Sequence, residues 1–311
     1  MRTRLPGTDL DVFPLCLGGN VFGWSADEAT SFAVLDAYVE AGGNFVDTAD
    51  AYARWLGHGG GESETIIGRW MRARGNRDDL VVATKVGKND GLDNLRPETI
   101  RTAVELSLGR LQTDRVDLYY AHQDHEADDL DATLETFDAL VREGKVRHLA
   151  ASNYSGPRLV EALDLQAAHG WAPYAALQPE YNLLERTTYE KEYAELCVQR
   201  GMGTLPYFGL ARGYLTGKYR SGSATVETVR SAAVRSRADE RGERIVDALV
   251  DVAERHGSTP AAVALAWLLT RPAVVAPIAS ARTPEQLADL LPMTTLELGT
   301  DDLELLEEVS A

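Results

Sequence analysis

The stretch that decides the fold is LVVATKVGKNDGLDNLRPETIRTAVELSLGRLQTDRVDLYYA, residues 80–121. It begins and ends with short apolar runs, residues 80–86 and 116–121, rather than with an alternating pattern. Strands that are apolar on both faces are typical of parallel sheets covered by helices. Between the runs, residues 97–111 start with proline, which costs no hydrogen bond at the first position of a helix. The stretch therefore predicts a strand–helix–strand unit.

The same pattern continues along the chain in both directions. Further short apolar runs predict strands at residues 15–19, 44–48, 148–152, 175–179, 203–207 and 274–279. Helical patterns lie at residues 27–41, 62–74, 130–142, 156–168, 188–200, 240–256 and 260–270. Eight strands that alternate with helices over 311 residues favour an α/β fold, a closed (β/α)₈ TIM barrel. An open doubly wound sheet is disfavoured, because no G-x-G-x-x-G joins a strand to a helix.

The pattern also predicts how the chain is organised around the barrel. A short N-terminal hairpin, residues 4–5 and 11–12 around Gly7-Thr8, is expected to cap the barrel floor. We expect a single domain over residues 1–311, since no linker, repeat or low-complexity tract interrupts the series. Residues 220–237, between the seventh strand and its helix, are low in apolar content, and connections of that length are usually lids or disordered.

Charge and composition exclude several classes of protein. The 48 acidic and 31 basic residues give a net charge of −17, which repels nucleic acids and anionic lipid surfaces. No apolar signal core follows Met1, and the longest apolar run, residues 261–269, is about half of what spans a bilayer. We therefore expect a cytoplasmic protein without nucleic-acid or membrane partners; no signal assigns an oligomeric state. Cys16 and Cys197 lie among apolar neighbours and are expected to be buried thiols.

Polar side chains stand at the ends of the predicted strands, which is where chemistry collects in such a barrel. Asp47 ends the second strand, with Tyr52 five residues later, Lys85 ends the third, and His122 follows the fourth. A lysine in an apolar strand is costly unless paired, and Asp47 is its natural partner. We expect the positive charge of Lys85 to lower the pKa of Tyr52. His122 is expected to bind a substrate oxygen or to assist proton transfer.

The four side chains can protonate a carbonyl oxygen, but none can reduce the carbonyl carbon, so a cofactor must supply hydride. A lone Tyr52 would more often be a packing residue; three partners at matching strand ends favour catalysis. Lysine is scarce, occurring only at positions 85, 88, 145, 191 and 218, so a lysine in a polar site is informative. No metal is expected, because the other strand ends offer Lys, Ser, Asn and Gln rather than converging ligands.

Asp47, Tyr52, Lys85 and His122 resemble the tetrad of the aldo-keto reductase superfamily, each at its matching strand end. Other stretches resemble the family in the family's order: GGNFVDTA (42–49), GKVR (144–147), ASN (151–153), LQPEYN (177–182), LARGYLTGKY (210–219) and SARTPEQ (280–286). The resemblance runs from residue 17 to about residue 290. Within the superfamily it is strongest to the bacterial branch related to potassium-channel β subunits.

The resemblance implies an NADP(H)-dependent reductase of aldehydes or ketones, with NADPH preferred over NADH and Tyr52 as the proton donor. It implies cofactor contacts at Gly19, Asn20, Asp47, Ser152, Asn153, Gln178, Tyr207, Phe208, Gly209, Leu210, Ala211, Arg212, Lys218, Ser280, Arg282, Gln286 and Asp289. By the same resemblance Ser280, Arg282 and Gln286 would hold the adenosine 2′-phosphate. The chain departs from the family at Phe208-Gly209, where Ser-Pro is usual, and at Ala288-Asp289, where Glu-Asn is common.

The sequence leaves the substrate open. The walls of the pocket are expected from Phe22, Trp24, Tyr52, Trp55 and His122. Such a pocket suits small aldehydes, ketosugars, small dicarbonyls and aryl ketones alike. A second hypothesis is a redox-sensing interaction protein that binds NADP(H) with little turnover, which the complete tetrad argues against. A metal-dependent barrel hydrolase is a third and weaker hypothesis.

Overall fold

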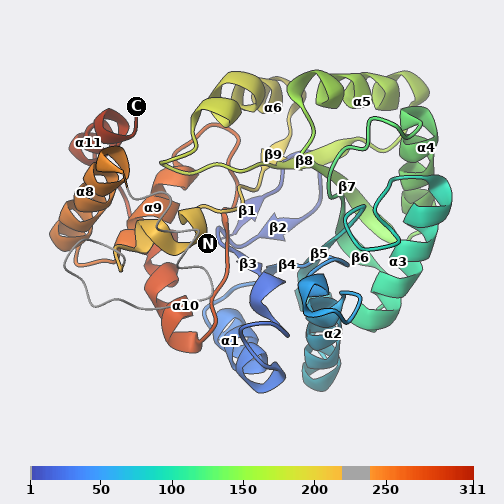
Figure 1. Ribbon diagram of the computed structural model, residues 1–311, viewed down its shortest axis with the longest axis horizontal. Helices are drawn as coiled ribbons and strands as arrows, with labels where there is room; N and C mark the ends of the chain where they lie inside the picture. The colour runs from blue at the N-terminus through green and yellow to red at the C-terminus, as the bar shows by residue number, and fades with distance from the viewer. Residues whose placement is uncertain (1, 219–238) are drawn as a thin grey trace.

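Eight parallel strands form one sheet, in the order β10-β3-β4-β5-β6-β7-β8-β9 (Figure 1). Their bounds are β3 Cys16–Gly18, β4 Phe45–Asp47, β5 Val81–Val86, β6 Val116–Ala121, β7 Val146–Ser152, β8 Tyr174–Gln178, β9 Gly203–Thr204 and β10 Ile278–Ala279. The computed structural model describes residues 2–218 and 239–311. The segment 220–237, for which a lid or disorder is predicted, lies outside the described residues.

Backbone hydrogen bonds join the two ends of this sheet into a barrel. Thr204 in β9 donates from its amide to Ala273 O at 2.8 Å and accepts from Val275 N at 3.0 Å. The amide of Ile278, the first residue of β10, donates to Pro206 O at 2.8 Å. The predicted (β/α)₈ TIM barrel is therefore confirmed.

Strands β9 and β10 are shorter than the runs 203–207 and 274–279 predict. Pro206 interrupts the first run and Pro277 the second. Proline has no amide proton to donate to a neighbouring strand, so regular pairing is broken at both positions. Isolated backbone bonds still hold the two segments together.

Helices surround the barrel (Figure 1). Their bounds are α1 Glu28–Glu40, α2 Glu62–Arg74, α3 Pro97–Leu111, α4 Leu130–Arg142, α5 Gly156–His169, α6 Ala194–Arg200, α8 Glu240–His256, α9 Pro260–Leu269, α10 Pro284–Leu290 and α11 Thr300–Ser310. Side-chain caps fix several starts: Asp27 accepts from Thr30 N at 2.8 Å before α1. Among the described residues, no helix is long and apolar enough to cross a membrane.

The sequence pattern predicted no helix over residues 300–310, where the structure has helix α11. The structure packs it against α8, where His256 and Asp302 approach to 2.7 Å. Arg241 in α8 also donates to Ser310 O at 2.6 Å. Leu306 is also fully buried in the main apolar core, so apolar packing together with these polar contacts holds the helix.

The N-terminal hairpin lies across the barrel at the amino ends of its strands (Figure 1). Its strands are β1 Thr3–Arg4 and β2 Asp11–Val12, one residue earlier than predicted for the first strand. Asp9 in the turn contacts Arg147 and His148 in β7 at 2.6 and 2.7 Å. The hairpin thus closes the floor of the barrel, and the opposite end is left for a site.

Candidate active site

Strands β4 and β5 bring a buried ion pair to the carboxyl end of the barrel. The ammonium of Lys85 is fully buried and donates to Asp47 Oδ2 at 2.6 Å, to Thr48 O at 2.7 Å and to Tyr52 OH at 2.9 Å. The hydroxyl of Tyr52 in turn donates to Asp47 Oδ2 at 3.2 Å. All three ammonium protons are used, which compensates for the burial of the charge.

The loop that carries Tyr52 is held closed by a tight glycine turn. Gly61 N donates to Tyr52 O at 3.1 Å, which returns the chain to the start of α2. Gly60 has φ +81°, and an added Cβ there would lie 2.6 Å from Asp50 O. Only glycine fits this position, so the turn fixes where the Tyr52 side chain points.

The acidity of Tyr52 differs from what the sequence predicts. Burial, together with the Asp47 carboxylate beside the hydroxyl, raises the pKa of Tyr52 well above its ordinary value. The expectation that Lys85 would lower this pKa is therefore wrong, because desolvation and a second charge outweigh the cation. Tyr52 consequently keeps its proton at neutral pH and can donate it.

His122 follows β6 and lies beside Tyr52, with the two ring centroids 6.2 Å apart. Burial and the positive charges of Lys85 and Lys88 lower the pKa of His122 well below its ordinary value. Its Nδ1 is buried, and no hydrogen-bond partner for it lies in the described part of the chain. A neutral imidazole of this kind can hydrogen-bond a ligand oxygen next to Tyr52.

Side chains from β7 and β8 are linked to the same cluster. Gln178 donates to Asp47 Oδ1 at 3.0 Å, and Ser152 donates to Gln178 O at 2.9 Å. Asn153 has a left-handed backbone, φ +55°, and its side-chain oxygen accepts from Tyr207 OH at 2.9 Å. The amide groups at this end are therefore oriented by the ion pair and by one another.

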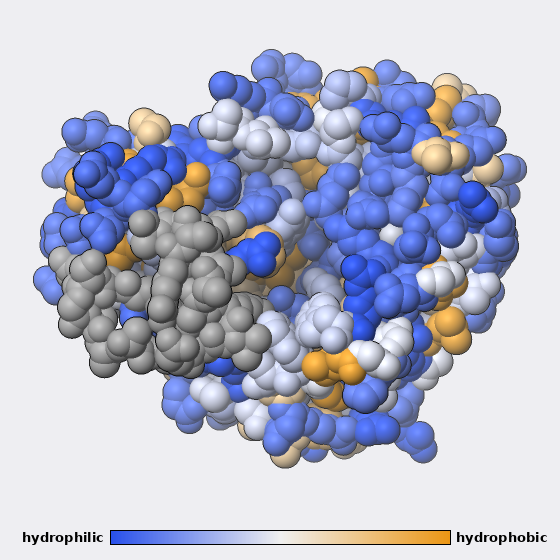
Figure 2. Space-filling model, viewed as in Figure 1, coloured by the Kyte–Doolittle hydropathy of each residue, from blue (hydrophilic) through white to orange (hydrophobic). Residues whose placement is uncertain are grey.

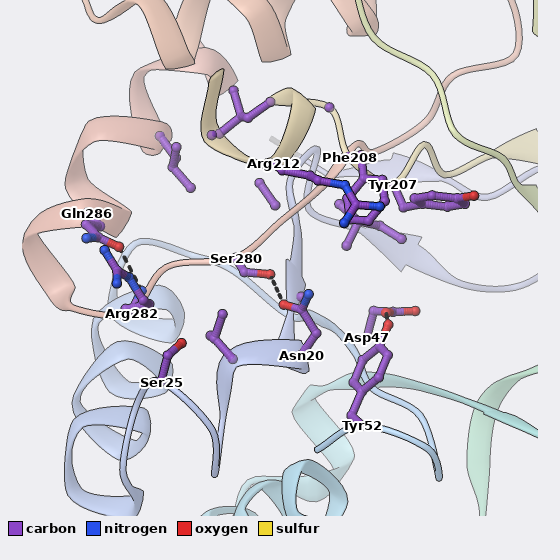
Figure 3. A pocket seen from close by; sticks show the side chains of 18 of the residues that line it. Asn20, Ser25, Asp47, Tyr52, Tyr207, Phe208, Arg212, Ser280, Arg282 and Gln286 are labelled. Atoms are coloured by element: carbon purple, nitrogen blue, oxygen red, sulfur yellow. Dashed lines mark hydrogen bonds between the residues drawn. The ribbon is translucent and has the colours of Figure 1, made fainter. Parts of the chain in front are cut away.

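A cavity of about 910 Å³ extends from this cluster across the mouth of the barrel. Figure 3 shows Tyr52 and Asp47 at one end, Arg282 and Gln286 at the other, and Ser280 between them. In the space-filling view this face is hollowed near its centre (Figure 2). The volume is near the upper end of the range for small-molecule sites, so the cavity suits an elongated ligand.

The end of the cavity near α10 carries several hydrogen-bonding groups. Ser280 Oγ donates to Asn20 Oδ1 at 2.6 Å, and Gln286 Oε1 accepts from Arg282 N at 3.1 Å (Figure 3). An added Cβ on Gly18 would lie 2.7 Å from Ser280 Oγ. The close approach of β3 and β10 therefore requires glycine, and a guanidinium at this end suits an anionic group.

The segment after β9 lies along the upper side of the cavity in Figure 3. Phe208, Ala211 and Arg212 have φ values of +54°, +47° and +61°, which residues other than glycine rarely adopt. The Arg212 guanidinium stacks on the Phe208 ring, 4.4 Å from its centroid. Backbone strain of this kind is typical of binding sites, where surrounding contacts hold it in place.

Most of the residues that the sequence singled out come together around this cavity. Those that line it are Asn20, Trp24, Asp47, Tyr52, Trp55, His122, Ser152, Asn153, Gln178, Tyr207, Phe208, Gly209, Leu210, Arg212, Lys218, Ser280, Arg282, Gln286 and Asp289. Lys85 is fully buried and does not line the cavity, but it donates to Asp47 and Tyr52, which do. Gly19, Phe22 and Ala211 are buried and do not line it. Phe22 packs in the main apolar core, so the expectation that it forms a substrate wall is wrong.

The sequence did not single out several other residues of the cavity wall. They are Gly18, Val21, Ser25, Lys88, Thr259, Ala261, Ile278, Ala279 and Leu290, while Gly213 and Thr216 lie in the stretch 210–219 that resembles the family. Most are small or apolar and carry no local signal. Lys88 did carry one, since it is a scarce lysine two residues after β5.

Metal and thiol chemistry gain no support at this site. Within residues 2–218 and 239–311, no three His, Cys, Asp or Glu side chains group so as to hold a metal ion. Cys16 and Cys197 are buried free thiols, as predicted.

Comparisons with known proteins agree with the geometry. The model of the Aldo/keto reductase family matches residues 14–311. The uncharacterized oxidoreductase YrpG of Bacillus subtilis is 36% identical, over 99% of this chain and 95% of its own length. Protein tas of Escherichia coli is 34% identical over 98% of this chain and 96% of its own. Norsolorinic acid reductase stcV of Emericella nidulans is 31% identical over 99% of this chain and 80% of its own length.

Proposed function

This chain belongs to the aldo/keto reductase family and is an oxidoreductase, and from that premise we propose that it reduces an aldehyde or ketone to the alcohol with NADPH, using Tyr52 as proton donor. The observation that carries the proposal is the Tyr52 hydroxyl. It lines the cavity while its oxygen accepts a hydrogen bond from Lys85 at 2.9 Å. A phenol held by a buried ammonium is suited to give up a proton to a ligand.

The shape and charge of the cavity support a dinucleotide. Its volume of about 910 Å³ exceeds what a small carbonyl compound needs. Ser280 and Arg282 offer a hydroxyl and a guanidinium to a phosphate, which favours NADPH over NADH. Arg212 and Lys218 add positive charge elsewhere along the cavity, while the negative charge of Asp289 disfavours a bound phosphate. When bound, the cofactor supplies the hydride that no side chain of the site can provide.

The chain itself delivers the proton and orients the carbonyl group. Tyr52 donates its proton to the oxygen as negative charge develops there, and Lys85 stabilises the phenolate that remains. His122, neutral because of its lowered pKa, donates a hydrogen bond to the same oxygen. With the hydride that a bound cofactor would supply to the carbon, this proton would complete the alcohol. In the reverse direction the Tyr52 phenolate accepts the proton of the alcohol.

Replacement of Tyr52 tests this role. In Tyr52→Phe we expect kcat to fall at least ~100-fold, since general acid catalysis contributes about 10²–10⁴-fold. The Kd for NADPH, measured by fluorescence titration, should stay at the wild-type value, because the hydroxyl serves the substrate. Tyr181→Phe is the matched control: its hydroxyl donates to Glu190 at 2.9 Å, and Tyr181 does not line the cavity.

Unchanged turnover in Tyr52→Phe would contradict the assignment. Tight NADPH binding by the wild type with negligible turnover of every carbonyl tested would instead favour the redox-sensing hypothesis. A parallel titration with NADH measures the contribution of the phosphate contacts. Equal Kd values for NADH and NADPH would contradict the preference for NADPH.

A further inference from the structure

We propose that Lys88 forms an anion subsite at the substrate end of the cavity, so that the preferred substrates are carbonyl compounds bearing a carboxylate or another acidic group. This inference rests on the proposed function and specifies its substrate class. The observation behind it is a half-buried lysine that lines the cavity and has no partner among the residues that the structure describes.

The backbone around Lys88 is anchored. Gly87 has φ +107°, and its carbonyl oxygen lies 2.7 Å from His125 Nε2. The guanidinium of Arg54 donates to Lys88 O. Leu92 N donates to Asn89 O at 2.9 Å and closes the turn that follows. The Lys88 side chain therefore starts from a fixed position two residues after β5.

Within the described part of the chain, Lys88 differs from the neighbouring cations because it has no partner. Lys85 is paired with Asp47 at 2.6 Å and Arg54 with Asp90 at 3.2 Å. In the described ranges, 2–218 and 239–311, the Lys88 ammonium makes neither a hydrogen bond nor an ion pair. A cation that has lost part of its hydration without a partner is unfavourable. An anion bound from the cavity would remove that cost.

The topology separates Lys88 from the proposed phosphate contacts. Strands β3 and β4 lie between β5, which precedes Lys88, and β10, which precedes Ser280 and Arg282. The charge of Lys88 acts instead on His122, which follows the adjacent strand β6. A ligand group next to Lys88 would therefore lie on the Tyr52 side of the cavity, where the substrate must be.

Two tryptophans indicate the shape of such a substrate. Trp24 and Trp55 line the same cavity and pack edge to face, with centroids 5.2 Å apart. Trp55 directly follows Arg54, which holds the Lys88 backbone, and is half exposed. Flat aromatic side chains suit a planar ring. An aryl aldehyde with an acidic substituent therefore combines both features.

A local cation also matters because of the charge of the whole protein. The net charge of −17 repels anionic solutes at long range. Acceptance of an anionic substrate then depends on positive groups within the site. Lys88 is placed to supply this charge where cofactor phosphates would not compete for it.

The test compares 4-formylbenzoate with 4-formylbenzamide, which share a shape and differ in one charge. We would measure kcat and KM for both with the wild type, Lys88→Met, Lys88→Arg and Lys191→Met. Lys191 is exposed and does not line the cavity, so it controls for loss of a lysine. In Lys88→Met the ratio of kcat/KM for acid over amide should fall about 10- to 100-fold, as for a charge-assisted hydrogen bond. The loss should lie mainly in KM, and the ratio should be kept in Lys88→Arg and Lys191→Met.

A binding measurement separates this inference from the proposed function. Benzoate and benzamide cannot be reduced as aldehydes, so calorimetric titration in the presence of NADP⁺ tests the subsite without turnover. Tighter binding of benzoate by the wild type, lost in Lys88→Met, supports the subsite even if no carbonyl is reduced. If both aldehydes are reduced but the acid-to-amide ratio is the same in Lys88→Met, the subsite is overturned and the reductase stands.

Discussion

The hydroxyl of Tyr52 is subject to opposing influences from its two nearest neighbours. The Lys85 ammonium at 2.9 Å favours the phenolate, while the Asp47 carboxylate at 3.2 Å and burial favour the phenol. Burial and the Asp47 carboxylate outweigh the Lys85 ammonium, so the pKa of Tyr52 is raised. This suits a donor whose proton is to leave only when a more basic alkoxide forms beside it. Until then, the proton does not escape to solvent.

The titration of Lys88 provides a prediction at the residue scale. Burial and the positive charges of Lys85 and Arg54 lower the pKa of Lys88 to about 8. The side chain is therefore charged below that pH and neutral above it. Of the facing groups, Lys85 is paired with Asp47 and Arg54 with Asp90. His122 is already neutral, and Tyr52 titrates well above this pH.

We therefore expect KM for 4-formylbenzoate to rise above about pH 8, approaching tenfold per pH unit. KM for 4-formylbenzamide should stay nearly constant over the same range, and the two are measured side by side. A KM for the acid that does not change between about pH 7 and pH 9.5 would contradict a role for the Lys88 charge.

The sequence predicted the contacts and properties of some residues of the site but not of others. Asp47 and Lys85 could be predicted to pair because charged residues that end apolar strands need partners. The direction of the Tyr52 pKa shift could not, because desolvation depends on packing that only the folded chain shows. The burial of Phe22 and Ala211 was missed for the same reason. Both residues are adjacent in sequence to residues that line the cavity, but their own side chains lie in the core.

At the scale of elements, one buried carboxylate ties three strands together at the floor. Asp117 in β6 accepts from Val82 N in β5 at 2.8 Å and from Arg147 in β7 at 2.7 Å. Arg77 before β5 approaches it to 2.9 Å. All four residues lie toward the amino ends of the strands, away from the cavity. This cluster of contacts around Asp117 therefore stabilises the fold without contacting the residues of the cavity.

Replacement of Asp117 by alanine should consequently separate stability from binding. We expect Asp117→Ala to lower the free energy of unfolding by about 2 to 4 kcal/mol, because the mostly buried Arg77 loses its ion-pair partner and the buried Val82 N loses its acceptor. The Kd for NADPH should be unchanged in the folded variant. Urea denaturation and fluorescence titration measure the two quantities. Asp114→Ala is the control, since its ion pair with Arg115 is exposed and contributes little.

A loss below about 1 kcal/mol in Asp117→Ala, or weakened NADPH binding without a loss of stability, would contradict this assignment.

The helices and strands themselves were largely predictable from the sequence, since apolar runs and helical periodicity follow local rules. The exceptions were β9 and β10, which proline shortens, and α11, which contacts with α8 stabilise. The lengths of β9 and β10 and the formation of α11 depend on contacts between segments that are far apart in the sequence.

At the scale of the whole molecule, the distribution of charge sets the cavity apart from the rest of the surface. The chain carries 48 acidic against 31 basic residues, yet Lys88, Arg212, Lys218 and Arg282 all line one cavity. A concave positive site in an acidic protein concentrates anionic ligands where they can bind. This matches a phosphate-bearing cofactor along the cavity and, on our inference, an acidic substrate at its end.

The central claim is that hydride passes to a carbonyl carbon within this site while Tyr52 supplies the proton. The most direct measurement follows deuterium from NADPH labelled with two deuterium atoms at the nicotinamide C4. The purified protein is incubated with this cofactor and 4-formylbenzoate, and the product is analysed by mass spectrometry and NMR. We predict an alcohol with one deuterium on its carbinol carbon, and almost none formed by Tyr52→Phe. An alcohol without deuterium, or labelled alcohol formed equally fast by Tyr52→Phe, would contradict the account.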